Sequence, residues 1–207
     1  MARQFGLFHW VEVPYAFSVV FVIIYLDWMI YYQHRIFHAY SWLWKIHRVH
    51  HTDPEVDATT ATRFHTLEMV LSTLFKSVFI VGLGAPPGGV FLFEAILNAS
   101  LLFAHSNGRM PLALDRVLRW VFVTPDMHRI HHSSFSKEYG SDFAFIFSFW
   151  DRLLGTYRDQ PEKSPEKMEL GLGYFNTGEY LEGKRILLQP FLDRKGKAAW
   201  ANLARRD

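Results

Sequence analysis

Residues 14–38 read PYAFSVVFVIIYLDWMIYYQHRIFH, an apolar run that leads straight into two histidines. The first part of this stretch, residues 14–32, is apolar except for Ser18 and Asp27. Its 19 residues approach the length of about 20 that a helix needs to cross the hydrocarbon core of a bilayer. No basic segment with a small-residue cleavage site accompanies the run. We therefore expect a retained transmembrane helix and not a cleaved signal peptide.

Two further apolar stretches, residues 67–84 and 90–104, flank the helix-breaking sequence APPGG and predict a helical hairpin. Lys76 lies in the first stretch and Glu94 in the second. Either charge would be costly against lipid. The hairpin therefore has a polar face inside the protein, or it is shallow and re-entrant.

Positive charges predict how these spans are oriented. Arg35, Lys45, Arg48 and Arg63 lie between the first span and the hairpin, whereas APPGG carries no charge. The positive-inside rule then places the histidine-rich loop in the cytoplasm, and three crossings place the C-terminal half there too. From about residue 157 the sequence is polar and predicts a solvated loop followed by a surface tail, GKAAWANLARRD.

Length and composition narrow the class of protein. The 207 residues fit one domain, residues 1–207. There are no cysteines, which excludes disulfides, thiolate nucleophiles and cysteine-based metal sites. The net charge of +2 comes without a dense basic block, so we expect no nucleic-acid partner. Any metal chemistry must therefore use histidine.

Eight histidines fall into three groups with helical spacing. One group is spaced i, i+4 and the other two i, i+3, i+4, so each group lies on one face of a helix. Imidazole binds iron, copper, zinc and nickel, and eight imidazoles exceed what one ion can use. The pattern predicts two metal ions, held by His34 and His38; by His47, His50 and His51; and by His128, His131 and His132.

Other polar residues are weaker candidates for the same site. His65 and His105 lie near the ends of the hairpin helices on the same side, where we expect them to complete the ligand set. His9 has no such context and fits an interfacial position.

Two further side chains each have two interpretations. Asp27 precedes His34 by seven residues and lies on the same helix face, where it either orients a ligating imidazole or reaches the membrane interface. Asn107 is either an additional oxygen ligand or, as we favour, a cap of the turn before GRMP.

Several phrases around these histidines resemble one protein family. HRIFH, HRVHH and HRIHH look like the three histidine boxes of the fatty acid hydroxylase/sterol desaturase superfamily. The flanking phrases LDWMIYYQHRIFH, LWKIHRVHHTDPEVDATTATRFHTLE, TPDMHRIHHS and FWDRLLGTYR are similar to its bacterial branch, which is related to alkylglycerol monooxygenase. The resemblance extends from about residue 14 to residue 192.

The resemblance implies an all-α integral membrane enzyme, with a cytoplasmic histidine-rich helical cap that holds a dinuclear metal site. It implies two iron ions, O2 as oxidant, and a lipid whose C–H bond is hydroxylated or desaturated. Carried over by position, the ligands are the eight histidines of the boxes, with His65 and His105 as additional members.

Three departures from the family pattern stand out. Members generally have further hydrophobic helices before the segment that begins here. The chain has Thr66 where the family commonly has proline. It has Asp142, Phe143 and Ala144 where the family has an asparagine, an aromatic residue and a glycine. The acid at Asp142 replaces an amide near the site, which makes it a candidate for altered hydrogen bonding around the ligands.

Partners and alternatives follow from what the sequence lacks. It contains no glycine-rich dinucleotide motif and no recognisable haem-binding segment, so the resemblance implies a separate electron donor, such as ferredoxin or cytochrome b5 with its reductase. The expected location is the bacterial inner membrane. The alternative is a histidine-rich membrane protein that binds or transports a transition metal, which the position of the boxes outside the spans disfavours. A zinc hydrolase would need a motif such as H-E-x-x-H, and the sequence has none.

Overall fold

The computed structural model describes residues 5–164, 167–175, 178–181 and 183–192. Within these residues the regular secondary structure is helical, and β structure is limited to two isolated bridges. The bridges join Phe122 to Phe147 and Ser133 to Leu170. The prediction of an all-α protein is therefore confirmed.

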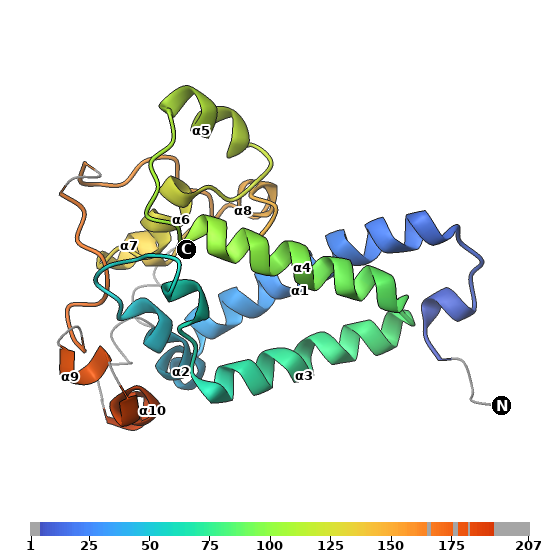
Figure 1. Ribbon diagram of the computed structural model, residues 1–207, viewed down its shortest axis with the longest axis horizontal. Helices are drawn as coiled ribbons and strands as arrows, with labels where there is room; N and C mark the ends of the chain where they lie inside the picture. Colours follow the sequence, from blue (N-terminus) through green and yellow to red (C-terminus); the bar gives the residue numbers. More distant parts are fainter. Residues whose placement is uncertain (1–4, 165–166, 176–177, 182, 193–207) are drawn as a thin grey trace.

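Three helices are long and apolar enough to cross a membrane: α1 (Tyr15–Ala39), α3 (Thr66–Leu83) and α4 (Pro87–Ala104). They lie side by side, with the smaller helices gathered at one end (Figure 1). Helix α1 continues beyond the predicted span and carries its two histidines out of the apolar run. Helix α3 exposes Val70, Leu74 and Val78, which fits a lipid environment.

The turn between α3 and α4 depends on glycine. Gly84 ends α3 with a φ of 63°, the left-handed conformation that favours glycine at this position. Gly6 packs against it so closely that a Cβ atom on Gly6 would lie 2.2 Å from the Gly84 nitrogen. The segment before α1, including η1 (Leu7–His9), is thereby held against the hairpin turn.

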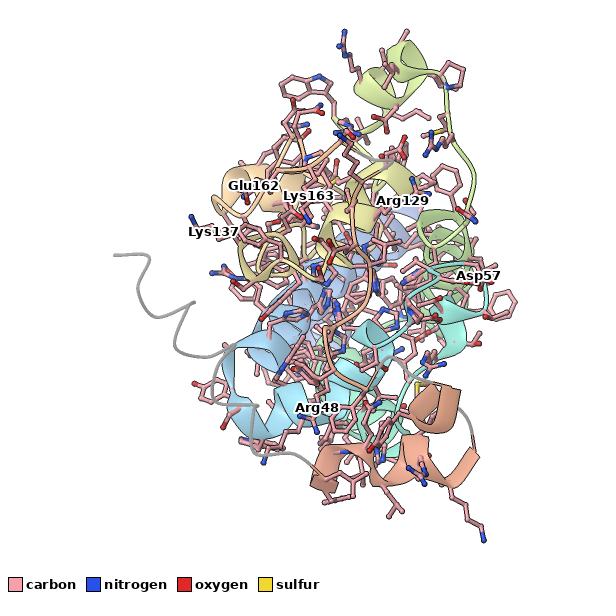
Figure 2. All side chains as sticks on the ribbon, turned by 90° about the vertical axis from the view of Figure 1, so that its left-hand side faces the viewer. Arg48, Asp57, Arg129, Lys137, Glu162 and Lys163 are labelled. Carbon is pink, nitrogen blue, oxygen red and sulfur yellow. The ribbon has the colours of Figure 1, made fainter. Side chains whose placement is uncertain are left out.

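The remaining elements form a cap at the opposite end of the spans, where α1 and α4 end and α3 begins (Figure 1). Figure 2 looks onto the cap, with Asp57 and Lys137 on opposite sides. Its elements are α2 (Ser41–His51), η2 (Thr60–Thr62), α5 (Leu112–Leu118), α6 (Pro125–His131), α7 (Ser136–Tyr139), α8 (Phe149–Leu153), α9 (Gly178–Leu181) and α10 (Gly183–Leu192).

The polar segment after residue 157 returns to the cap. Its loop is exposed at Glu162 and Lys163, as the composition predicts. The backbone N–H of Gly171 then donates to the carbonyl of His132 at 3.1 Å. Helix α10 packs on α2, and the Arg48 guanidinium donates to the carbonyl of Gln189 at 2.5 Å. The predicted tail, residues 196–207, lies outside the described residues.

Asp27 fastens the cap to the first span. Its carboxylate is completely buried, so it does not reach the membrane interface. It accepts hydrogen bonds from the backbone N–H groups of Ile146 and Phe147, at 3.2 and 3.1 Å, and from the Trp150 indole at 2.9 Å. Its hydrogen bonds thus go to the loop before α8 and not to an imidazole, which corrects the expectation that Asp27 orients a ligand directly.

Replacing Asp27 by alanine leaves these three donors without their acceptor. We expect Asp27→Ala to lower the free energy of unfolding by at least about 2 kcal/mol, measured by chemical denaturation in detergent. Ser18→Ala is the control on the same helix, because among the described residues the Ser18 hydroxyl bonds only to the carbonyl of Tyr15 within α1. Equal losses in the two variants would contradict the anchoring role of Asp27.

Candidate metal centre

Nine buried histidines converge in the cap as two groups. In each group, one ring nitrogen per residue lies within 4.8 Å of the corresponding nitrogens of all the others. The five-histidine group consists of His34, His38, His47, His51 and His131, and the four-histidine group of His50, His105, His128 and His132.

Helical spacing distributes the two triplets over both groups. On α2, His47 and His51 enter the five-histidine group and His50 enters the four-histidine group. At α6, His131 enters the five-histidine group, whereas His128 and His132 enter the four-histidine group. The groups share a wall, since the rings of His51 and His132 stack with centroids 4.6 Å apart. The arrangement supplies two adjacent groups, each of which could hold a metal ion.

Backbone carbonyls fix the tautomers of two rings in the five-histidine group. His34 donates from Nδ1 to the carbonyl of Phe143 at 2.8 Å, and His131 donates from Nδ1 to the carbonyl of Ser141 at 2.7 Å. A neutral imidazole has only one N–H, so each Nε2 carries a lone pair. These two Nε2 atoms lie 3.1 Å apart with no proton between them.

A carboxylate fixes the tautomer of His47. Its Nδ1 lies 2.6 Å from Oε1 of Glu68, which leaves Nε2 to face the group. That atom is 3.0 Å from Nε2 of His34 and 3.2 Å from Nε2 of His51. A ligating histidine is commonly oriented by such a carboxylate. Glu68 therefore has a defined place in the site, which our sequence analysis missed.

Backbone carbonyls also fix the tautomers of two rings in the four-histidine group. His50 donates from Nδ1 to the carbonyl of Thr60 at 3.1 Å, and His105 donates from Nδ1 to the carbonyl of Leu101 at 2.8 Å. Their Nε2 atoms, each with a lone pair, lie 3.1 Å apart. Nε2 of His105 is also 3.0 Å from that of His128. Lone pairs converge here as well.

This geometry fits two metal ions. Lone pairs that face each other repel unless a cation lies between them. A metal–nitrogen bond of about 2.1 Å with ligand angles near 90° separates neighbouring nitrogens by about 3.0 Å. The measured Nε2–Nε2 distances of 3.0–3.2 Å agree with that value. Both ring nitrogens of His38 are buried without a hydrogen-bond partner among the described residues, so one of them is available to a metal.

Burial keeps these rings neutral. It lowers the pKa of His131 to about 3 and the pKa of His105 to about 4, because the charged imidazolium loses its hydration. Burial also lowers the pKa values of His50, His51 and His132 well below the usual range. At neutral pH the lone pairs are therefore free of protons and available to a metal.

The carbonyls that orient His34 and His131 belong to one loop held by carboxylates. Asp151 accepts hydrogen bonds from the backbone N–H groups of Phe143, at 2.8 Å, and Ala144, at 3.0 Å. Burial raises the pKa of Asp151 to about 6, and these hydrogen bonds oppose the shift. Asp151 is a second site residue that sequence reasoning missed, although it lies in the quoted phrase FWDRLLGTYR.

Asp142 lies between the two orienting carbonyls of Ser141 and Phe143. Its φ of 54° is left-handed, a conformation that aspartate and asparagine tolerate better than most residues. Its carboxylate accepts from the backbone N–H of Arg158 at 2.9 Å. Asp142 thus shapes the loop that orients the ligands and, in its described contacts, bonds to no imidazole.

Two other expected residues, His65 and Asn107, lie outside the two groups. Nδ1 of His65 accepts from the backbone N–H of Leu67 and caps α3, while Nε2 donates to the carbonyl of Leu187 at 3.1 Å. Both nitrogens of His65 therefore have partners, and the structure does not bring it to the metal centre. Thr66 is the first residue of α3, a position that also suits proline. Asn107 is exposed, in contrast to the buried imidazoles.

A cavity of about 530 Å³ adjoins the five-histidine group. It lies between α1, α3 and α4, with His34, His47 and Glu68 in its wall. Apolar side chains of the spans, such as Ile30, Ile80 and Leu97, line the rest together with several polar ones. A lipid-sized apolar group therefore has room next to the candidate metal centre.

Comparison with known proteins agrees with this site. The sequence profile of the fatty acid hydroxylase family matches residues 19–156. The ornithine lipid hydroxylase OlsE of Rhizobium tropici is 32% identical over 189 residues, which are 89% of this chain and 53% of that protein. The alkylglycerol monooxygenase of Xenopus tropicalis is 29% identical over 155 residues, 74% of this chain and 33% of that protein.

The cholesterol 25-hydroxylase of Mus musculus is 26% identical over 169 residues, 75% of this chain and 55% of that protein. The chain thus spans from about a third to about half of the length of these relatives. No solved structure gives a significant match.

Removing one imidazole from either group tests the two-site arrangement. We expect His51→Ala and His50→Ala each to lower the bound metal from two ions per chain toward one, because each variant breaks a different group. Metal analysis of purified protein by mass spectrometry measures this. His9→Ala, which changes an exposed histidine, keeps the native metal content. Loss of both ions in both variants would contradict independent groups.

Asp142→Asn tests the loop by pH dependence. Burial raises the pKa of Asp142 well above its usual value, so the folded chain holds a proton that the unfolded chain has released above about pH 4. The contribution of Asp142 to the free energy of unfolding therefore falls as the pH rises above about 4. Asparagine does not titrate, so its contribution stays constant. We expect Asp142→Asn to be more stabilising near pH 8 than near pH 5 in thermal unfolding.

The half-buried Asp57 provides the control, since a hydrogen bond from Thr59 lowers the pKa of its carboxyl. Asp57 is therefore ionised in both chain states throughout this pH range, and Asp57→Asn has a constant effect. A constant effect for Asp142→Asn as well would contradict the raised pKa.

Proposed function

Because the chain belongs to the fatty acid hydroxylase family, we propose that it is a membrane oxygenase that uses two iron ions and O2 to hydroxylate a C–H bond of a lipid. The observation that carries the proposal is the convergence of nine buried imidazoles, in two groups, beside a cavity between the membrane helices. Imidazole ligands suit iron and add no negative charge to it. The relatives named above are hydroxylases and monooxygenases, which supports this reaction class.

The proposed ligands are the nine histidines of the two groups. His65 is left out because both of its nitrogens have protein partners. Iron is proposed from the family and the donor set. Imidazole also suits zinc and copper, so the metal must be identified by experiment.

The chain's own residues would prepare the site for this chemistry. When bound, the iron pair would supply the activation of O2 and the removal of a hydrogen atom from carbon. Phe143 and Glu68 hold the rings of His34 and His47 in fixed orientations through their Nδ1 atoms. Phe145 packs on His34 with ring centroids 4.8 Å apart, which closes the cavity wall at that point. These apolar walls exclude water and place a C–H bond next to the metal ligands.

Hydroxylation and desaturation both begin with removal of a hydrogen atom. We propose hydroxylation because the relatives' names describe hydroxylases and monooxygenases. Metal transport is less well supported, because the imidazole ligands would have to continue along a path through the membrane. Here the nine histidines cluster at the cap, and neither α3 nor α4 contains a histidine.

Electron supply and location complete the proposal. A separate donor, such as ferredoxin or cytochrome b5 with its reductase, would deliver the two electrons. The cap would face the cytoplasm of a bacterial inner membrane. The four cations Arg35, Lys45, Arg48 and Arg63 lie at the cap end of the spans, which supports this orientation.

Iron-57 Mössbauer spectroscopy of the chain enriched from membranes tests the proposal. We expect the spectrum of a spin-coupled iron pair, followed by incorporation of one oxygen-18 atom from labelled O2 into a lipid when an electron donor is added. Correctly inserted protein that carries zinc, or iron without coupling, would overturn the oxygenase. Removal of iron by a chelator is the control and should abolish product formation.

A further inference from the structure

An ion pair lies within the membrane hairpin. Nζ of Lys76, on α3, is 2.5 Å from Oε1 of Glu94, on α4. Both side chains line the cavity beside the five-histidine group and keep 17% and 36% of their surface accessible. The sequence leaves open whether these charges face the interior or mark a shallow hairpin. The structure shows that the two side chains contact each other and that both line the cavity.

The ion pair belongs to a polar stripe on that wall. Positions 72, 73, 76 and 77 follow the spacing of one face of α3. Positions 94 and 98 do the same on α4. The polar side chains of this stripe are Ser72, Thr73, Lys76, Ser77, Glu94 and Asn98, and all of them line the cavity. Polar residues in membrane spans commonly face an internal cavity and bind a substrate.

The ion pair and the five-histidine group lie at different levels along α3. Glu68, which bonds to His47, lies eight residues before Lys76 on the same helix. A rise of 1.5 Å per residue separates the two levels by about 12 Å. A molecule that fills the cavity therefore contacts the five-histidine group at one end and the ion pair further along.

Lys76 and Glu94 can each form further hydrogen bonds. An ammonium has three donors, and among the described residues Lys76 uses one of them on Glu94. Oε2 of Glu94 has no protein hydrogen-bond partner among the described residues. The pair has no net charge, so a ligand with a net charge would be poorly compensated between the spans. A neutral group that both donates and accepts a hydrogen bond fits best.

We propose that Lys76 and Glu94 bind a hydroxyl or amide group of the lipid substrate, at a level about 12 Å along α3 from Glu68. The proposal rests on the proposed function, because it assigns the cavity to the substrate of that reaction. It makes the two residues determinants of specificity for a lipid with a neutral polar group, and not for a plain hydrocarbon. A purely structural ion pair that only joins α3 to α4 would show no such selectivity.

A binding experiment separates these two roles. The native chain in lipid nanodiscs is equilibrated with carbon-14-labelled 1-dodecanol, dodecanamide or dodecane, and retention is compared with empty nanodiscs. The variant is Lys76→Met with Glu94→Met. An apolar pair of similar volume commonly replaces a buried ion pair without loss of stability, so this variant should fold. The same two changes at the exposed ion pair of Lys163 and Glu169 are the matched control.

We expect the native chain and the control to bind dodecanol, dodecanamide or both about tenfold more tightly than dodecane, as one or two hydrogen bonds would produce. The variant at Lys76 and Glu94 should lose that preference and still bind dodecane, which shows that its cavity is intact. Whichever probe is preferred identifies the group as hydroxyl or amide. No preference in the native chain, or a preference that persists in the variant, overturns the inference.

Mössbauer spectra of the same samples keep the two proposals apart. Binding requires neither an electron donor nor O2. Coupled iron without a binding preference would overturn the inference and leave the oxygenase in place. A preference without coupled iron would overturn the oxygenase and leave the polar binding site in place.

Discussion

Imidazole lone pairs that face one another at about 3 Å are the constraint on which the rest of this structure depends. Such an arrangement is repulsive without a cation, and it is favoured where a ring is held with its proton on Nδ1. The carbonyls of Phe143, Ser141, Thr60 and Leu101 provide this by accepting the Nδ1 proton of four different rings. The cap is therefore built around backbone acceptors as much as around histidines.

Three buried aspartates hold the loop that supplies two of those acceptors. Asp27 reaches the loop from α1, Asp151 from α8, and Asp142 lies within it. A carboxylate removed from water is unfavourable by itself, and the backbone N–H groups it accepts from offset that cost. Because Asp27 belongs to a membrane span, the same hydrogen bonds join the position of the span to the orientation of the ligands.

The membrane helices provide a cavity beside the histidine groups as well as an anchor in the bilayer. The spans α1, α3 and α4 line a partly open cavity with His34 and His47 in its wall, together with a polar stripe. A cavity meant only for a hydrocarbon would need no ion pair in its wall, and charged groups are costly at this depth. In the proposed function, the polar wall selects lipids by their polar group and not by volume alone.

The sequence by itself determined the three spans, the all-α class and the three histidine faces. These features arise from apolar run length and from the helical repeat, both local properties of the chain. Only the tertiary structure decided how the histidines divide into five and four, that His65 caps a helix, that Glu68 contacts His47, and that Asp151 holds the loop beside His34. Contacts such as that between His34 and Phe143 join residues 109 positions apart, and no local pattern encodes them. The physical reason is that a tautomer or a lone pair is fixed by its partner across the fold, whereas a helix is fixed by its own neighbours.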